Sequence, residues 1–330
     1  MTKSKIAREW RTKHPDMPTL KLARIIYAKD SVAYKSIEDV RSTLRYIEGK
    51  QGIQAKACIK DKSFVKDEER PKNPYSLPTS DETKYEPYVL KGHKRLLLLS
   101  DIHVPYHSVD ALTAVFDYAK KNKPDAILLN GDTLDFFGLS RFCKDPRKRH
   151  FAAELQAFKE LIDVIKKNFP LAKLYFKVGN HEERYMHYLW MKAGELVGVE
   201  EFELERIISS RANGITIISD KRIIRANELN IIHGHEFASG FFSPVNVARG
   251  LYLRGKTNAI QGHNHQSSEH TESNMNGKIT TTWSTGCLCE LHPEYMPLNK
   301  WNLGFAMIEL DTNKRDFEVK NMRIVNGKIV

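Results

Sequence analysis

Five short polar stretches carry the side chains that could do chemistry in this sequence. Each follows an apolar run that is typical of a buried strand. In chain order the stretches are Asp101–His103, Gly131–Asp135, Gly179–Glu182, His233–His235 and Gly262–His265. Because ligands bind at the carboxyl ends of the strands in α/β sheets, we expect the five stretches to converge on one site.

The candidate metal ligands in these stretches are carboxylates, one amide and several imidazoles: Asp101, His103, Asp132, Asn180, His233, His263 and His265. This set of oxygen and nitrogen donors favours Mn, with Fe, Zn, Co or Ni as alternatives, over a lone Mg or Ca site. Seven ligands are too many for one tetrahedral zinc ion. They suit two divalent ions about 3.5–4 Å apart that share one carboxylate.

The order and spacing of the five stretches resemble the signature of the calcineurin-like metallophosphoesterases. The matching residues are Asp101-x-His103, Gly131-Asp132-x-x-Asp135, Gly179-Asn180-His181-Glu182, His233 and Gly262-His263-x-His265. The resemblance covers about residues 94–312. It implies an α/β fold in which two mixed β-sheets, flanked by helices, form a sandwich.

The resemblance also implies a role for each residue. One metal would be bound by Asp101, His103 and His265 and the other by Asn180, His233 and His263, with Asp132 bridging the pair. His181 would protonate the leaving oxygen, and Asp135 would orient His181. The two cations would neutralise the phosphoryl oxygens and lower the pKa of a bridging water, which would attack as hydroxide. An imidazole titrates in the range that this proton donation requires.

Several neighbouring residues leave alternatives open. His235 competes with His233 for one ligand position, and we favour His233 because it directly follows the strand. Arg184 lies one turn after the third stretch and could contact a substrate phosphate, although a helix-surface salt bridge explains it at least as well. Tyr106 and His107 follow the first stretch and could line the site.

Phe136, directly after Asp135, departs from the pattern of the protein phosphatases of this superfamily, which usually carry Arg there. This difference favours the bacterial and phage-type branch. We therefore predict a phosphodiesterase or nuclease-like hydrolase that acts on nucleic acids or nucleotides. The alternatives are a phosphoprotein phosphatase or a dinucleotide-polyphosphate hydrolase and, in another class, a nucleic-acid-binding regulator or scaffold with a phosphoesterase fold.

Alternating strands and helices must position the five stretches. Helical periodicity predicts helices at 108–122, 150–168 and 183–210 between the strands, and a further helix near 244–252. Strands that alternate with helices indicate right-handed crossovers and an α/β sheet. The segments after residue 265 read as antiparallel strands, with Asn276-Gly277 as a hairpin turn.

The first 60 residues form a separate basic region with 14 Lys/Arg and 6 Asp/Glu, which is +8 of the net charge of +11. Apolar residues recur at helical spacing in three segments within 3–49, and three short basic helices resemble a helix-turn-helix module. Its third helix would offer Lys35, Arg41 and Arg45 to DNA or RNA. A protein-docking, oligomerising or merely solvated helical cap explains the pattern at least as well. Four prolines within 61–90 predict a linker, so the domains would be 1–60 and 91–330.

Composition limits the remaining classes of protein. A hydrophobic share of 41% is ordinary for a globular chain, and no apolar run approaches the length needed to span a bilayer. The four cysteines, Cys58, Cys143, Cys287 and Cys289, show neither a disulfide framework nor a zinc-binding spacing. We expect no secretory signal, no membrane partner and a cytoplasmic location, and a homo-oligomer is compatible with all of these observations.

Overall fold

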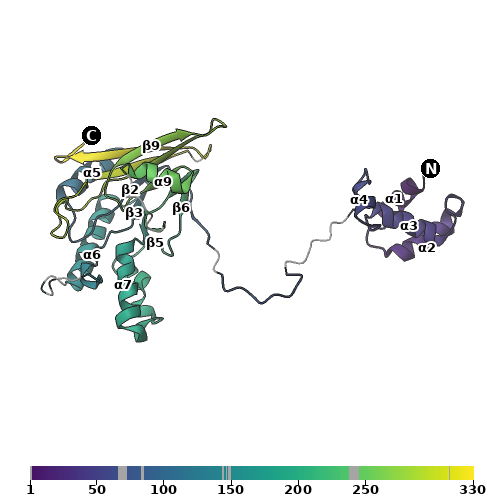
Figure 1. Cartoon of the computed structure of the whole chain (residues 1–330), viewed down its shortest axis with the longest axis horizontal. Helices are drawn as coiled ribbons and strands as arrows, with labels where there is room; N and C mark the ends of the chain where they lie inside the picture. Colours follow the sequence, from purple (N-terminus) through teal and green to yellow (C-terminus); the bar gives the residue numbers. More distant parts are fainter. Residues whose placement is uncertain are drawn as a thin grey trace. The chain divides into compact units, whose positions relative to one another are not determined.

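The structure is a computed structural model of the chain, and it describes residues 2–65, 73–82, 85–142, 145, 147, 150–237, 245–311 and 313–330. Cys143 lies outside the described residues. The chain forms two compact units, Met1–Glu82 and Thr83–Val330, which are described separately (Figure 1).

The N-terminal unit is a small helical bundle, and the three helices predicted within 3–49 are present. Its apolar stripes meet in one buried core that includes Leu22, Ile26, Leu44 and Ile47. The Ser36 hydroxyl accepts a hydrogen bond from the Asp39 N–H at 3.2 Å, so it caps the third helix. The helices are α1 (Lys3–Lys13), α2 (Thr19–Lys29), η1 (Ser31–Ala33), α3 (Ile37–Ile47) and α4 (Ile53–Ala57).

The C-terminal unit contains two mixed sheets, as predicted. The seven-stranded sheet has the order β13-β12-β11-β2-β3-β4-β5, and the six-stranded sheet has the order β1-β6-β7-β8-β10-β9. Strands β2 to β5 are mutually parallel, so their carboxyl ends meet at one edge of the sheet. The strands are β1 (Tyr88–Leu90), β2 (Arg95–Leu99), β3 (Ala126–Asn130), β4 (Lys173–Lys177), β5 (Thr216–Ile218), β6 (Ile224–Ala226), β7 (Leu229–Ile231), β8 (Ala259–Gln261), β9 (Ser268–Ser273), β10 (Ile279–Ser284), β11 (Leu303–Leu310), β12 (Phe317–Val325) and β13 (Lys328–Ile329).

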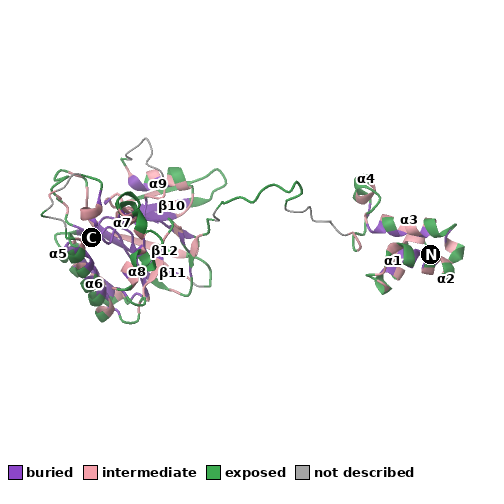
Figure 2. Ribbon diagram, turned by 90° about the horizontal axis from the view of Figure 1, so that it is seen from below, coloured by how far each residue is buried: buried purple, intermediate pink, exposed green. Residues whose placement is uncertain are grey.

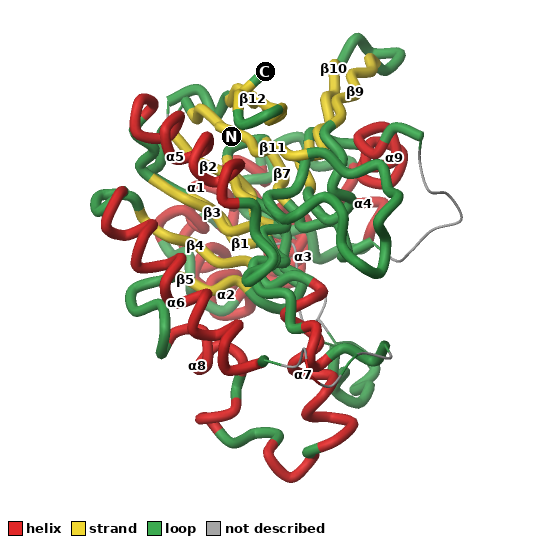
Figure 3. The backbone as a smooth tube through the Cα atoms, turned by 90° about the vertical axis from the view of Figure 1, so that its left-hand side faces the viewer, coloured by secondary structure: helices red, strands yellow, loops and turns green. Residues whose placement is uncertain are grey.

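Both faces of the seven-stranded sheet are covered, which explains why its central strands are continuous apolar runs. On β2, Leu96 and Leu98 pack into the core shared with the six-stranded sheet, whereas Leu97 and Leu99 pack into the core beneath the helices. Figure 2 shows buried ribbon in the interior of this unit and exposed ribbon on the outer sides of α5 and α6. Helices α5 and α6 lie on one side of the strands and α9 on the other (Figure 3). The helices of this unit are α5 (Val109–Asn122), η2 (Phe137–Leu139), α6 (Phe151–Asn168), α7 (Asn180–Lys192), η4 (Gly194–Leu196), η5 (Glu200–Phe202), α8 (Leu204–Ser209) and α9 (Val247–Gly255).

Two local predictions differ from the structure. The helix predicted at 183–210 begins at Asn180 and is interrupted between α7 and α8, where Gly194 and Gly198 weaken helical structure. Residues 88–90, assigned to the linker, form β1, which pairs in parallel with β6. Across the described residues, we find no helix that combines the length and the apolar character needed to cross a bilayer.

Candidate metal centre and active site

The predicted ligands gather at the carboxyl ends of five strands from both sheets. The loops after β2, β3 and β4 leave the seven-stranded sheet, and those after β7 and β8 leave the six-stranded sheet. Backbone hydrogen bonds tie the first two loops together: the Asp101 N–H donates to the Gly131 carbonyl at 3.2 Å, and the His103 N–H donates to the Asp132 carbonyl at 2.9 Å. The convergence expected from strand ends therefore occurs.

The first group of side chains consists of Asp101, His103 and His265, and all three are buried. His265 Nε2 lies 3.3 Å from Asp101 Oδ1 and 3.3 Å from His103 Nε2. Two imidazole nitrogens that face each other beside a carboxylate form a typical donor set for a cation.

The second group consists of Asn180, His233 and His263, and Asp132 lies between the two groups. His233 Nε2 lies 3.1 Å from Asn180 Oδ1 and 3.2 Å from Asp132 Oδ2. Donor atoms of Asp132, His233 and His263 lie within 4.8 Å of one another, as do those of Asp132, His103 and His181. The position of Asp132 therefore suits a shared ligand.

The backbone at the cluster adopts an unusual conformation. Five of the seven candidate ligands have φ between +50° and +68°, a backbone region that residues other than glycine rarely occupy. Gly179 is required for packing, since a Cβ atom there would lie 2.3 Å from Asp132 Oδ1. Such strain concentrates at functional sites, where the surrounding structure enforces it. The five residues are Asp101, His103, Asp132, His263 and His265.

Glu182 joins the second and third stretches and was not singled out as a site residue from the sequence. Its buried carboxylate accepts hydrogen bonds from the N–H groups of Asp132 at 3.0 Å, Leu134 at 2.8 Å and Gly179 at 2.8 Å. Burial and the neighbouring Asp132 carboxylate raise the pKa of Glu182 to about 7. Its position three residues after Gly179, at the start of α7, is the sequence signal that could have revealed it.

A buried ion pair supports the fourth stretch. Lys177, the last residue of β4, has a fully buried side chain whose Nζ lies 2.9 Å from Glu236 Oε1. The Glu236 carboxylate also accepts hydrogen bonds from the N–H groups of His233 at 2.9 Å and Gly234 at 2.6 Å. Burial raises the pKa of Glu236, but Lys177 and His235 outweigh burial and lower it to about 2.

Asp135 contacts two histidines through one oxygen. Its Oδ1 accepts hydrogen bonds from Nδ1 of His103 and Nδ1 of His181, each at 2.9 Å. The Nε2 atoms of both rings therefore face the centre. Arg184 donates to the Asp135 carbonyl and to His181 Nε2, both at 2.8 Å, so it lies within the site and not on an open helix surface.

A further buried carboxyl, Glu154 of α6, lies behind Asp135 and was also missed. The N–H groups of Phe136 and Phe137 near its carboxyl favour the charged form and lower its pKa. Burial, with the Asp135 carboxylate as the second cause, raises the pKa of Glu154 to about 8. At neutral pH this group is therefore mostly a neutral acid.

The electrostatics of the centre favour positive charge. Burial lowers the pKa of His233, but the carboxylates of Asp132 and Asp101 outweigh burial and raise it to about 10. The same competition, with Asp101 as the main opposing charge, raises the pKa of His265 to about 10. Burial and the neighbouring His233 instead lower the pKa of His263 to about 4. The buried carboxylates of Asp101 and Asp132 therefore favour positive charge beside them.

A sequence model of the calcineurin-like phosphoesterases matches residues 94–267, which is more than half of the chain. The chain belongs to this family. The family resemblance predicted from the five stretches is therefore confirmed, and the chain is a metal-dependent phosphoesterase.

The phosphoesterase is similar to two phage proteins and, more distantly, to solved structures. It is 27% identical over 233 residues to the Gene 54 protein of Mycobacterium phage L5, covering 66% of this chain and 89% of that protein. It is 26% identical over 236 residues to the Gene 54 protein of Mycobacterium phage D29, covering 67% and 90%. Vacuolar Protein Sorting 29 from Cryptosporidium parvum is 14% identical, with a TM-score of 0.39 and coverage of 72% and 95%. This last likeness carries no functional argument.

The residues of the phosphoesterase fit the divalent metal that the family implies. His103 Nδ1 donates to Asp135, and His233 Nδ1 donates to the Asn130 carbonyl at 2.8 Å. Each ring is thereby fixed in the tautomer that leaves Nε2 free to bind a metal. Two groups of oxygen and nitrogen donors with oriented imidazoles are what a divalent cation requires.

His235 lies next to the centre but faces a different partner. Its Nε2 lies 3.2 Å from Glu183 Oε1, whereas His233 points Nε2 at Asp132 and Asn180. This geometry suits His233 as the ligand of the phosphoesterase and gives His235 a carboxylate partner instead.

The other residues suggested from the sequence occupy separate places. Tyr106 lines a pocket beside His103 and His265. His107 does not, because it lines a hollow between α5 and α6. Cys289, for which the spacing of the cysteines predicted no metal site, has its sulfur within 4.8 Å of imidazole nitrogens of His103 and His265.

The three basic residues suggested for nucleic-acid binding lie in the N-terminal unit. Lys35 precedes α3 and is exposed, and its N–H donates to Asp39. Arg41 pairs with Glu38 at 3.2 Å, and the Arg45 guanidinium donates to the Lys50 carbonyl at 3.3 Å.

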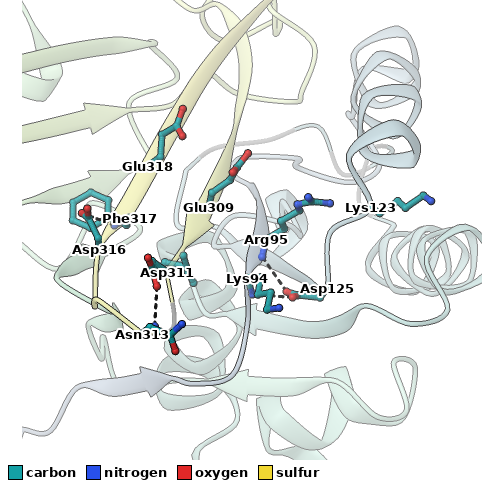
Figure 4. A pocket seen from close by; sticks show the side chains of 11 residues that line it. Lys94, Arg95, Lys123, Asp125, Glu309, Asp311, Asn313, Asp316, Phe317 and Glu318 are labelled. Atoms are coloured by element: carbon teal, nitrogen blue, oxygen red, sulfur yellow. Dashed lines mark hydrogen bonds between the residues drawn. The ribbon is translucent and has the colours of Figure 1, made fainter.

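A larger pocket among the described residues of the phosphoesterase lies away from the metal-ligand cluster. It has a volume of about 710 Å³ and is lined by residues at the amino ends of β2 and β3, including Lys94, Arg95 and Asp125 (Figure 4). There, Asp125 accepts hydrogen bonds from the N–H groups of Lys94 and Arg95. The volume of a pocket therefore does not identify the active site of this protein.

Proposed function

We propose that this phosphoesterase uses two divalent cations, with Mn²⁺ as the preferred ion, to hydrolyse phosphoester bonds in nucleotides or nucleic acids. The observation that carries the proposal is the arrangement of seven oxygen and nitrogen donors in two groups, with Asp132 between them. The Gene 54 relatives come from phages, which is consistent with the phage-type branch but does not name a substrate.

The protein side chains would divide the work of the reaction. When bound, the cations would neutralise phosphoryl oxygens and supply an activated water. Asp135 fixes Nδ1 of His181, and His181 Nε2 lies 3.7 Å from Asp132 Oδ2. His181 is thus placed to give its proton to the leaving oxygen. A substrate phosphate would accept the hydrogen bond that Arg184 donates to His181 Nε2, which would free Nε2 to carry the proton that His181 gives to the leaving oxygen.

A direct test is to assay the full chain with Mn²⁺ on 5′-mononucleotides, cyclic nucleotides, short oligonucleotides and phosphopeptides. Asp132→Asn should lower kcat/KM at least 100-fold, because a neutral amide is a poor bridging ligand. Asp163→Asn, at an exposed position on α6, is the matched control and should retain activity. Equal activity in the Asp132 variant and wild type, or faster turnover of phosphopeptides, would overturn the proposal.

For the N-terminal unit we propose contact with DNA or RNA. The support is its charge of +8 within residues 1–60 and the exposure of Lys35 and Arg45 on its surface. Salt-dependent binding of the full chain to short duplex and single-stranded probes should weaken in a Lys35→Ala, Arg41→Ala, Arg45→Ala variant. The slope of log affinity against log salt should become shallower by about one for each phosphate that the variant no longer neutralises. An unchanged slope would favour a protein-docking or oligomerising role.

A further inference from the structure

A pocket adjoins one side of the metal-ligand cluster. Its volume is about 270 Å³, and His103, Asp135 and His265 are among its lining residues. We propose that this pocket binds the nucleobase of the substrate, an inference that rests on the proposed function. The rest of the lining is mainly aromatic and acidic, from Tyr106, Phe137, Glu290, Glu294, Tyr295 and Trp301.

The loop that forms much of the pocket is fixed to the metal-ligand loops by backbone hydrogen bonds. The Leu288 N–H donates to the Asp101 carbonyl at 3.0 Å, and the Asn302 N–H donates to the His265 carbonyl at 2.9 Å. The Glu290 N–H donates to the Tyr106 carbonyl at 2.8 Å. The pocket is thus built before a ligand arrives. Its loop follows residues 94–267, so the match to the family does not specify it.

The aromatic rings suit a flat ligand. The Trp301 ring lies 4.1 Å from the His265 ring, and the Tyr295 ring lies 6.4 Å from Trp301, measured between centroids. Tyr295 is 63% exposed and Tyr106 is 44% exposed, so both have surface available to a ligand. Bases stack on such side chains irrespective of sequence. A volume slightly below the range of drug-sized sites is enough for one base and too small for a second nucleotide.

The Glu290 carboxylate of the pocket disfavours a phosphate chain and favours a base that carries an amino group. Within the described residues, the exposed Glu290 carboxylate has no hydrogen-bond or ion-pair partner. A carboxylate there repels a second phosphate but accepts hydrogen bonds from the amino groups of guanine, cytosine or adenine. Uracil and thymine lack an amino group and place carbonyl oxygens on both sides of their N–H, so they should bind less well.

The pocket also indicates which part of the substrate leaves. Asp135 lines it and holds His181, whose ring lies 4.4 Å from that of His103. A base in this pocket would place its sugar beside the proposed proton donor. The nucleoside is therefore the leaving alcohol, and the phosphate stays with the centre.

The experiment pairs substrates that differ only in the base. For monoesters, guanosine and uridine 5′-monophosphate are compared with ribose 5-phosphate; for diesters, nucleoside 2′,3′-cyclic phosphates are compared with glycerol 1,2-cyclic phosphate. Tyr295→Ala should raise KM for the guanosine substrate about 10-fold and should raise KM for the base-free substrate much less. Glu290→Gln should reduce the preference for guanosine over uridine. Tyr188→Ala, at an exposed position on α7 that does not line the pocket, is the control.

Calorimetric titration of guanosine and uridine monophosphates into the full chain gives a readout that is independent of turnover. Tighter binding of guanosine monophosphate that is lost in Tyr295→Ala supports the pocket, even if no ester is hydrolysed and the proposed function fails. If hydrolysis depends on Asp132 but its rate is the same with and without a base on the substrate, the proposal that the pocket binds a base is wrong and the proposed function stands. A preference for phosphocholine over every nucleotide also overturns the proposal that the pocket binds a base, because aromatic and acidic walls can hold a quaternary ammonium.

Discussion

Lys173 and Lys177 occupy opposite ends of the same strand, β4, and their surroundings differ sharply. Lys173, at the amino end, is exposed. Lys177, at the carboxyl end, is fully buried, pairs with Glu236 and donates to the Arg222 carbonyl at 2.6 Å. The same residue type is therefore a solvated surface charge at one end of the sheet and an internal support of the metal-ligand loops at the other.

The pockets at the two ends differ in the same way. The amino-end pocket is the larger, but its charged lining includes exposed groups such as Lys94 and Lys123. The carboxyl end holds a smaller pocket beside buried side chains whose donors and acceptors are fixed by other buried groups, as Asp135 fixes His103. Mutual orientation of buried polar groups, and not the volume of a hollow, distinguishes the reactive end.

The largest effect on activity is expected from substitution of His181. His181→Ala should lower kcat about 10²- to 10⁴-fold on a substrate with an alcohol leaving group, because the proton donor is lost. The loss should be smaller for a p-nitrophenyl ester, whose leaving group needs no proton. His187→Ala, at an exposed position on the same helix, is the control in these steady-state assays. An equal loss for both leaving groups would contradict the role as proton donor.

The next effect concerns stability. Lys177→Met leaves the buried Glu236 carboxylate without its cation and should lower the free energy of unfolding by about 3–5 kcal/mol. Lys173→Met, on the exposed end of the strand, should change it by less than about 0.5 kcal/mol. Urea titrations followed by circular dichroism measure both. If both variants unfold at the same urea concentration, the distinction between the two ends of the strand is wrong.

A pH-dependent effect is expected at Glu154. Its pKa is about 8 in the folded chain, against 4.5 for an unperturbed Glu, so the folded state keeps a proton that the unfolded state releases between these values. Stability should therefore fall as pH rises from 5 to 8, by up to about 1.4 kcal/mol per pH unit. Glu154→Gln should remove the contribution of this group and make the slope shallower, and Glu160→Gln, at an exposed position on the same helix, should keep the wild-type slope. Unfolding titrations at three pH values measure these slopes. If the free energy of unfolding of Glu154→Gln changes with pH as steeply as that of wild type, the expectation is wrong.

The smallest effect is expected at Asp125 in the amino-end pocket. Asp125→Asn keeps an oxygen that can accept from the Lys94 and Arg95 N–H groups, so stability should change by less than about 1 kcal/mol. Phosphoesterase activity should remain within about two-fold of wild type, because this pocket lies at the far edge of the sheet. A ten-fold loss would mean that the amino end takes part in function.

The sandwich and the convergence of the ligands could be predicted because each ligand sits in a polar stretch directly after an apolar strand. That pattern places His233 and Asp101 at one edge of the fold without any knowledge of tertiary contacts. The spacing of the stretches then identified the family. Strand ends, helical stripes and turn residues are features that local sequence encodes.

The supporting residues could not be found in this way. Lys177 and Glu236 lie 59 positions apart, and only the packing of the two sheets brings their charges together. Glu154 resembles any other helical Glu until the fold places it behind Asp135. The loop that carries Tyr295 has no periodic pattern, so its role beside the centre follows from long-range backbone hydrogen bonds alone.

The left-handed backbone at five of the seven ligands has a thermodynamic consequence for the chain as a whole. Each such residue opposes its own local preference by on the order of 1–3 kcal/mol, so the rest of the fold must hold these loops in place. Ions that bind only to the assembled loops would return stability to the native state by mass action. Metal availability would then set the lifetime of the folded protein as well as its rate of turnover.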